Sequence, residues 1–129
     1  MNKTILIVED DPVLRWIMAN FIREAQYEIS VQSNGLEAME WLSKGNIPDL
    51  IITDYMMPLM NGGELIASLR KSGIFKAIPI ILLTAVDNAQ SDLANIHADH
   101  ILNKPFDPQD LIRLITDILN TKSKAIKYA

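Results

Sequence analysis

Carboxylate side chains follow directly on two strand-like apolar segments of this sequence. Glu9, Asp10 and Asp11 come after the first segment, and Asp54 comes after the third. Two carboxylates about 4 Å apart repel each other by about 4 kcal/mol at an effective dielectric constant near 20. Packed carboxylates therefore persist only where protons or a cation relieve this repulsion. A hard divalent cation does so best, and Mg²⁺ accepts one or two carboxylates while it keeps several waters.

Two further polar residues stand at the ends of strand-like segments. Thr84 ends the fourth segment, and Lys104 lies just beyond the fifth. Asp11 has a second interpretation, because an aspartate directly before Pro12 is typical of a helix N-cap. For Asp11 we favour the cap, and for Asp10 with Asp54 we favour a metal site.

Strand-like and helix-like segments alternate along the chain. The expected strands are residues 5–8, 27–31, 50–53, 78–83 and 101–102, and the expected helices follow Asp11-Pro12, Asn34-Gly35, the loop 57–63, Asp87-Asn88 and Asp107-Pro108. Five strands and five helices in alternation predict an α/β fold, a parallel sheet covered on both faces. The carboxyl ends of parallel strands share one edge, where ligands bind. Acids after the first and third strands would converge there if those strands are neighbours.

Composition limits the kind of protein. The chain has 129 residues, a net charge of −4 and no cysteine, which predicts one acidic domain without disulfides or thiolate metal sites. The acidic balance argues against direct binding of nucleic acid. No apolar run approaches the roughly 20 residues needed to cross a membrane. The first residues lead straight into a strand without a signal peptide, so we expect a cytoplasmic protein.

Four segments together resemble the receiver domain of response regulators in two-component systems. They are Ile5-Leu6-Ile7-Val8-Glu9-Asp10-Asp11-Pro12, Asp54-Tyr55-Met56-Met57-Pro58 with Asn61-Gly62, Leu83-Thr84-Ala85, and Lys104-Pro105-Phe106. The resemblance implies a flavodoxin-like, doubly wound sheet with strand order 2-1-3-4-5. It also implies a receiver domain at residues 1–121, followed by a short basic tail at residues 122–129.

The resemblance assigns a role to each residue at the strand ends. Asp54 would accept a phosphoryl group from a histidine kinase or a phosphotransfer protein, so the chain would be a signalling switch and not an enzyme. Mg²⁺ would be bound by Asp10, Asp54 and the backbone carbonyl of Met56, and by Glu9 through a water. Lys104 and Thr84 would contact the phosphoryl oxygens. The resemblance further implies a cis peptide bond before Pro105.

Some positions depart from the family pattern. Receivers usually carry an aromatic switch residue three positions before the lysine, and this chain has Ile101. We therefore expect an atypical output face, with signalling through protein contacts. Met56 and Val86 offer no group that orients water, which predicts slow self-dephosphorylation. His97 and His100 are a weak candidate for a metal site, and Trp16 is either an exposed partner contact or packed over a loop.

Other functions stay open at this point. The main alternative is a receiver-like interaction module that does not use phosphate. A flavin carrier is disfavoured because the first loop is Glu-Asp-Asp, and a phosphatase of the Asp-x-Asp type because Met56 stands two residues after Asp54. A weak homodimer is a further hypothesis, because receivers often pair through their fourth and fifth elements. For the tail with Lys122, Lys124 and Lys127 we favour a solvated terminus over the start of a linker.

Overall fold

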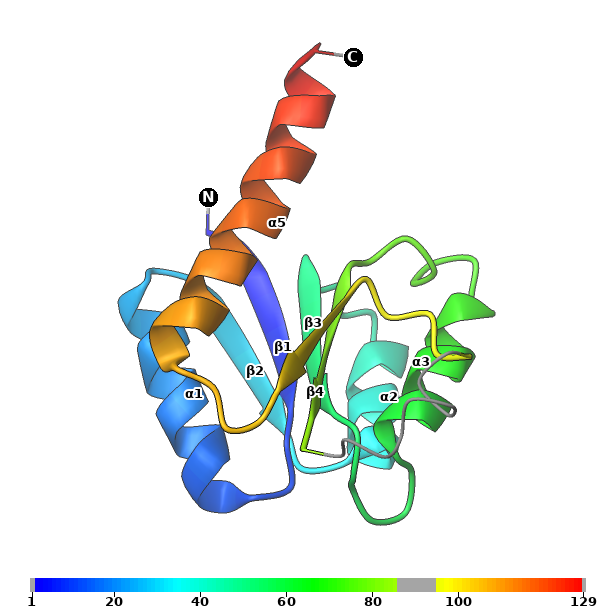
Figure 1. The fold of residues 1–129 in the computed structure, drawn as a ribbon. Helices are drawn as coiled ribbons and strands as arrows, with labels where there is room; N and C mark the ends of the chain where they lie inside the picture. Colours follow the sequence, from blue (N-terminus) through cyan, green and yellow to red (C-terminus); the bar gives the residue numbers. More distant parts are fainter. Residues whose placement is uncertain (1, 86–94, 129) are drawn as a thin grey trace.

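The chain folds around one parallel five-stranded sheet (Figure 1). Its structure is a computed structural model, which describes residues 2–85 and 95–128, with side chains through residue 120. The strands are β1 (Thr4–Val8), β2 (Glu28–Gln32), β3 (Leu50–Asp54), β4 (Ile80–Thr84) and β5 (His100–Asn103). Their order is β2-β1-β3-β4-β5. The expected order and the parallel pairing are confirmed, so β1 and β3 are neighbours at the centre of the sheet.

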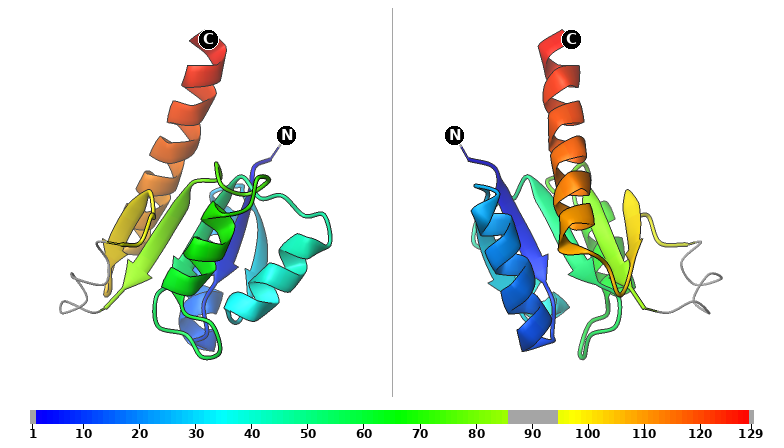
Figure 2. Two further views of the ribbon diagram at one scale, coloured as in Figure 1. Left: turned by 90° about the vertical axis from the view of Figure 1, so that its right-hand side faces the viewer. Right: turned by 60° about the vertical axis from the view of Figure 1, so that its left-hand side comes forward.

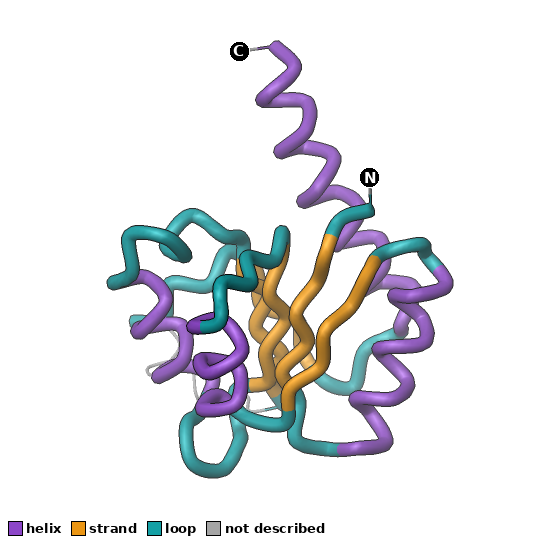
Figure 3. The backbone as a smooth tube through the Cα atoms, turned by 180° about the vertical axis from the view of Figure 1, so that it is seen from behind, coloured by secondary structure: helices purple, strands orange, loops and turns teal. Residues whose placement is uncertain are grey.

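Helices cover both faces of the sheet. The described ones are α1 (Pro12–Glu24), α2 (Gly35–Ser43), α3 (Gly62–Arg70) and α5 (Pro108–Tyr128). The pair α1 and α5 lies on one face and the pair α2 and α3 on the other, as the two views of Figure 2 and the tube of Figure 3 show. The helix expected after Asp87-Asn88 lies outside the described residues.

The core is divided into two halves by the sheet. In β1, Ile5 and Ile7 pack toward α1 and α5, whereas Leu6 and Val8 pack toward α2 and α3. All four are fully buried, and burial of each such side chain contributes about 1.5–3 kcal/mol. A strand that is buried on both faces has no polar face, which is why residues 5–8 form an unbroken apolar run.

Local side chains set the helix ends where the sequence indicated them. The Val13 amide donates to Asp11 Oδ1 over 2.9 Å, and the Glu37 amide donates to Asn34 Oδ1 over 2.9 Å. These bonds satisfy amides that have no partner inside the first turn. Gly45 follows α2 with a φ of 94°, a left-handed conformation that glycine adopts without strain.

Helix α5 crosses the boundary predicted at residue 121. Its backbone continues through that position without a break and runs to Tyr128. Figure 1 shows this helix extending past the sheet, away from the carboxyl ends of the strands. Among the described residues, no helix is long and apolar enough to span a membrane.

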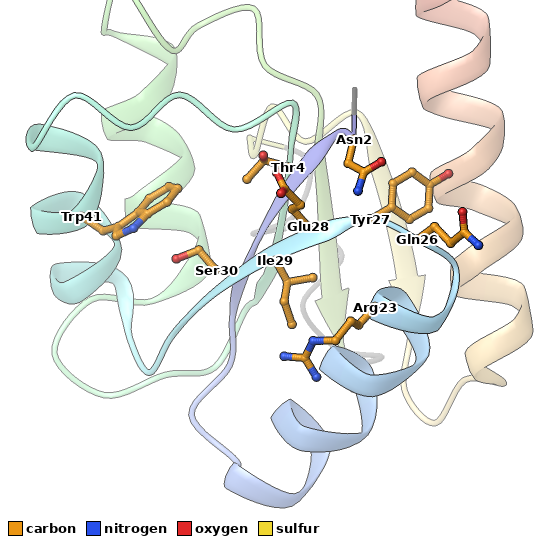
Figure 4. A pocket seen from close by; sticks show the side chains of 9 residues that line it. All are labelled: Asn2, Thr4, Arg23, Gln26, Tyr27, Glu28, Ile29, Ser30 and Trp41. Carbon is orange, nitrogen blue, oxygen red and sulfur yellow. The ribbon is translucent and has the colours of Figure 1, made fainter.

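A shallow groove of about 650 Å³ runs along the edge strand β2 (Figure 4). Arg23, Tyr27 and Ile29 line it together with Trp41, which reaches it from α2. The groove lies away from the acids that follow β1 and β3, so it is separate from the chemistry that the sequence predicts.

Candidate functional site

The strand register brings the predicted residues to one edge of the sheet. Val8 pairs with Thr53, Asp54 with Leu83, and Thr84 with Asn103. The residues that end these strands or follow them therefore lie side by side, although they are up to 95 positions apart in the sequence. This edge holds Glu9, Asp10, Asp54, Thr84 and Lys104.

Three carboxylates form the centre of the site. Oxygen atoms of Glu9, Asp10 and Asp54 all lie within 4.8 Å of one another. Glu9 is fully buried and Asp54 is only 5% exposed, whereas Asp10 is open to solvent. This is the only group of three or more possible metal-binding side chains within the described parts of the chain. Its all-oxygen donor set and its half-open geometry suit a hard divalent cation.

Lys104 is the positive partner of these acids. Its Nζ lies 3.0 Å from Glu9 Oε1 and 3.0 Å from Asp54 Oδ2. The Lys104 amide also donates to the Thr84 carbonyl over 2.8 Å. The peptide bond between Lys104 and Pro105 is cis, as expected. One ammonium group faces three carboxylates, so the site has room for further positive charge.

The two ion-pair partners have shifted pKa values. Burial raises the pKa of the Glu9 carboxyl from 4.5 to about 7, although bonds from Lys104 and from the Asp11 amide act to lower it. Burial acts to lower the pKa of Lys104, but its bonds to Glu9 and Asp54 outweigh this, and the pKa is raised above 10.5. The lysine is therefore cationic at neutral pH, whereas the Glu9 carboxyl is present in both its protonated and its ionised form.

The backbone that follows Asp54 is held by the start of α3. The Gly62 amide donates to the Tyr55 carbonyl over 2.8 Å. A Cβ atom on Gly62 would clash with the Asp54 carbonyl oxygen, so only glycine permits this approach. A capping box fixes the same helix end, because Asn61 and Glu64 each accept a bond from the other's amide. Asn61 and Glu64 have the same three-residue spacing as Asn34 and Glu37, so this helix start had a recognisable sequence pattern.

The remaining predicted residues lie at the end of β4, in the segment after β3 and at the start of α1. Thr84 is buried at the end of β4, one position before Ala85. Met56 comes two residues after Asp54, and its side chain is 62% exposed. Asp11 caps α1 and is not in the acidic cluster, as predicted. Val86 lies outside the described residues.

The output-face positions are exposed. Ile101 is 45% exposed on the edge strand β5, and His97 and His100 are exposed as well. Neither histidine belongs to a possible metal-binding group in the described residues. The carbonyl of His97 accepts a bond from Arg70 Nε over 2.9 Å, so this segment is tied to the end of α3.

An apolar groove of about 460 Å³ borders Lys104, and no sequence pattern predicted it. Val13, Leu14 and Ile17 of α1 line one side, and Pro105 and Phe106 line the other. Lys104 and Ala85 also line the groove. The nearby Trp16 is 68% exposed, so it does not pack over a loop.

Residues 5–116 match the profile of the response regulator receiver domain. The chain belongs to the response-regulator receiver family. The receiver domain of a histidine kinase from Syntrophus aciditrophicus superposes with a TM-score of 0.87 at 32% identity, over 92% of this chain and 91% of that one. The response regulator TrrA of Thermotoga maritima, solved with Mg²⁺-BeF, has a TM-score of 0.79 at 36% identity, over 89% and 97% of the two chains.

Curated relatives are regulators of greater length. The probable transcriptional regulator ycf29 of Pyropia yezoensis is 35% identical over 121 residues, which is 92% of this chain and 54% of the relative. This receiver chain thus spans about half the length of the first relatives that it matches. As a receiver it is a signalling module of a two-component system, with a flavodoxin-like fold and an acidic cluster able to bind Mg²⁺.

Proposed function

We propose that Asp54 is the residue that accepts the phosphoryl group. The observation that carries this proposal is the position of its carboxylate, 3.0 Å from Lys104 and within 4.8 Å of two other acids, at the rim where parallel strands end. Lys104 offers a cation to the incoming phosphoryl oxygens. Thr84, buried at the end of the adjacent strand, is the proposed hydroxyl contact to the same oxygens.

The same acids would hold Mg²⁺. Asp10, Asp54 and the backbone carbonyl of Met56 would bind it, and Glu9 would act through a water. When bound, the ion offsets the charge of both the phosphoryl oxygens and the carboxylates. The excess of carboxylates over ammonium groups in the cluster supports this assignment.

The transfer is a nucleophilic displacement at phosphorus. An Asp54 carboxylate oxygen attacks the phosphorus of a phosphohistidine, and an O–P bond forms as the P–N bond to the imidazole breaks. The imidazole nitrogen keeps the electron pair and takes up a proton. Asp54 becomes an aspartyl phosphate, and Lys104 exchanges its bond to the Asp54 carboxylate for one to a phosphoryl oxygen. Because the group stays on the chain, we assign no enzymatic turnover.

The donor would be a histidine kinase or a phosphotransfer protein that docks beside the acids. The apolar groove between α1 and the segment Pro105-Phe106 leads to Lys104, and exposed Val13 and Trp16 extend its apolar surface. Exposed apolar side chains beside a reactive group are typical of a protein-binding surface. We place this encounter in the cytoplasm, where phosphoryl donors made from ATP are found.

The output would pass through protein contacts rather than through direct binding of nucleic acid by this chain. Ile101, exposed on β5, replaces the aromatic switch of other receivers, so a downstream protein or a weakly bound second copy would meet an aliphatic surface there. This substitution also favours the second candidate function, an interaction module that keeps the fold without phosphorylation.

Incubation with acetyl phosphate and Mg²⁺, followed by intact mass measurement, separates the two functions. A phosphorylatable receiver gains the mass of one phosphoryl group, and Asp54→Ala does not. The gain should also disappear when EDTA removes the Mg²⁺. An unchanged mass of the parent chain at saturating donor and Mg²⁺ would leave the interaction module as the better account.

A further inference from the structure

Arg15 of α1 reaches back to the carboxyl end of β1. Its Nη1 donates to the Glu9 carbonyl oxygen over 2.9 Å and also lies 3.2 Å from Ser33 Oγ. The Ser33 amide in turn donates to Glu37 Oε1 over 3.1 Å. One guanidinium group therefore links the end of β1 with the loop between β2 and α2.

This bond completes the set of partners around Glu9. The Glu9 amide donates to the Gln32 carbonyl over 3.1 Å. Its carboxylate accepts bonds from Lys104 Nζ at 3.0 Å and from the Asp11 amide at 3.2 Å. The carbonyl is the remaining polar group of this fully buried residue, and Arg15 donates to it. A buried carbonyl that loses its donor is costly, so the backbone would move to find another.

The carbonyl that Arg15 holds belongs to the peptide group between Glu9 and Asp10. That group is planar, so its orientation fixes the direction in which the chain leaves Glu9 and enters Asp10. Both residues belong to the acidic cluster. A rotation of this peptide group would turn the two carboxylates away from the position they share with Asp54.

We propose that Arg15 is a positioning residue of the phosphorylation site, which holds the Glu9–Asp10 peptide group so that both carboxylates face one cation. The proposal rests on the assignment of these acids as the Mg²⁺ site. Arg15 Nη1 carries two N–H groups, so it can donate to the Glu9 carbonyl and to the Ser33 hydroxyl at once. The planar guanidinium holds these N–H groups in fixed directions, whereas the donors of a lysine ammonium rotate freely.

The test compares Arg15→Met with Arg23→Met. Both arginines lie on α1, but Arg23 is exposed at its far end and lines the groove along β2. Mg²⁺ affinity is measured by calorimetry without any phosphoryl donor, and thermal unfolding confirms that each variant is folded. We expect Arg15→Met to weaken Mg²⁺ binding roughly tenfold, as is typical when an outer-shell partner is removed. Arg23→Met should bind as the parent does, and Arg15→Lys should lie between.

The phosphorylation rate with acetyl phosphate gives the second readout. If Arg15 only positions the acids, the rate of Arg15→Met approaches the parent rate at saturating Mg²⁺. A folded Arg15→Met whose Mg²⁺ affinity stays within twofold of the parent would overturn the proposal, even if its melting temperature falls. Should Arg15→Met not fold, Arg15→Lys decides by the same criterion. A parent that binds Mg²⁺ but is not phosphorylated refutes the proposed function alone, and a parent that binds no Mg²⁺ refutes both.

Discussion

The Glu9 carboxyl is fully buried and yet lies in a cluster of acids. Burial raises its pKa to about 7, above the ordinary 4.5. A protonated Glu9 adds no negative charge to the site, whereas its ionised form attracts a cation. The protonation of one side chain is thus coupled to metal binding in the pH range in which cells operate.

Mg²⁺ affinity should therefore increase with pH. Because the raised pKa keeps Glu9 protonated below about pH 7, a cation must displace that proton at pH 6 but not at pH 8. One linked proton predicts roughly tenfold tighter binding at pH 8 than at pH 6. Calorimetric titrations at both values check this, with Glu9→Gln as the control that should flatten the dependence. Equal affinities of the parent at the two pH values would contradict the coupling.

We expect the side chain of Met56 to affect the lifetime of the phosphorylated state. It is 62% exposed beside Asp54 and carries no group that orients water. Met56→Asn should speed the loss of the phosphoryl group roughly tenfold, because an amide can position the attacking water. This rate is measured by intact mass, as the fraction of phosphorylated protein that remains at intervals after the donor is removed. If the parent loses phosphate quickly and Met56→Asn does not change the rate, slow self-dephosphorylation is refuted.

The sequence predicted the charged residues of the site but not the contacts that hold the backbone around them. Asp54 and Lys104 follow apolar runs, and parallel strands bring such ends together, so their position follows from simple topology. The contact of Arg15 with the Glu9 carbonyl has no comparable sequence pattern, because it depends on the path of α1 relative to β1. The roles assigned to the individual side chains remain predictions.

At the scale of elements, the start of α3 is packed directly against the chain that leaves β3. Gly62 allows this contact, because a Cβ there would meet both the Asp54 carbonyl and the Tyr55 backbone. The sequence marked residues 57–63 as a turn-rich loop, but a Gly62-Gly63 pair does not reveal which glycine faces another backbone. The structure shows that Gly62 carries this constraint.

Gly62→Ala should destabilise the protein by about 3 kcal/mol, because the added methyl group forces backbone atoms apart. Gly73→Ala is the matched control, since a Cβ there meets nothing within 4 Å. Urea unfolding followed by circular dichroism measures both. A midpoint for Gly62→Ala equal to that of Gly73→Ala would show that the close approach is not needed.

A second link between elements joins α3 to the strands at the edge. Arg70 donates to the carbonyls of Lys76 and Ile78 over 2.9 Å each, and forms a 2.7 Å ion pair with Asp99. Arg70→Met should therefore lower the free energy of unfolding by about 2 kcal/mol. Lys71→Met, at the exposed position next to it, should change the free energy of unfolding little. Urea unfolding of the two variants checks this, and equal midpoints would count against the link.

At the scale of the whole molecule, the open surfaces have different chemistry. The groove between α1 and Pro105-Phe106 is mainly apolar and is lined in part by Lys104, whereas the groove along β2 holds charged and polar groups such as Arg23 and Glu28. The sequence predicted the layers and strand order through the family resemblance. It could not predict either groove, because each depends on side chains from separate elements.

Trp16→Ala should weaken phosphotransfer from a protein donor without affecting a small one. Loss of an exposed aromatic anchor typically raises the KM of a docking partner roughly tenfold, whereas acetyl phosphate needs no docking surface. Ile74→Ala is the control, because Ile74 is equally exposed but lies in the loop after α3. Rates are compared using a phosphorylated phosphotransfer domain that is active on the parent. An equal fall in rate with both donors would contradict a docking role.

When a strand has apolar side chains on both faces, their burial does little to select one pairing register over another. If β1 slipped by one residue against β3, Ile5 and Ile7 would exchange sides with Leu6 and Val8 at little loss of apolar burial. The same slip would carry Glu9 out of reach of Lys104 and leave a buried charge unpaired. The ion pair between Glu9 and Lys104 therefore favours the observed register of β1 against β3.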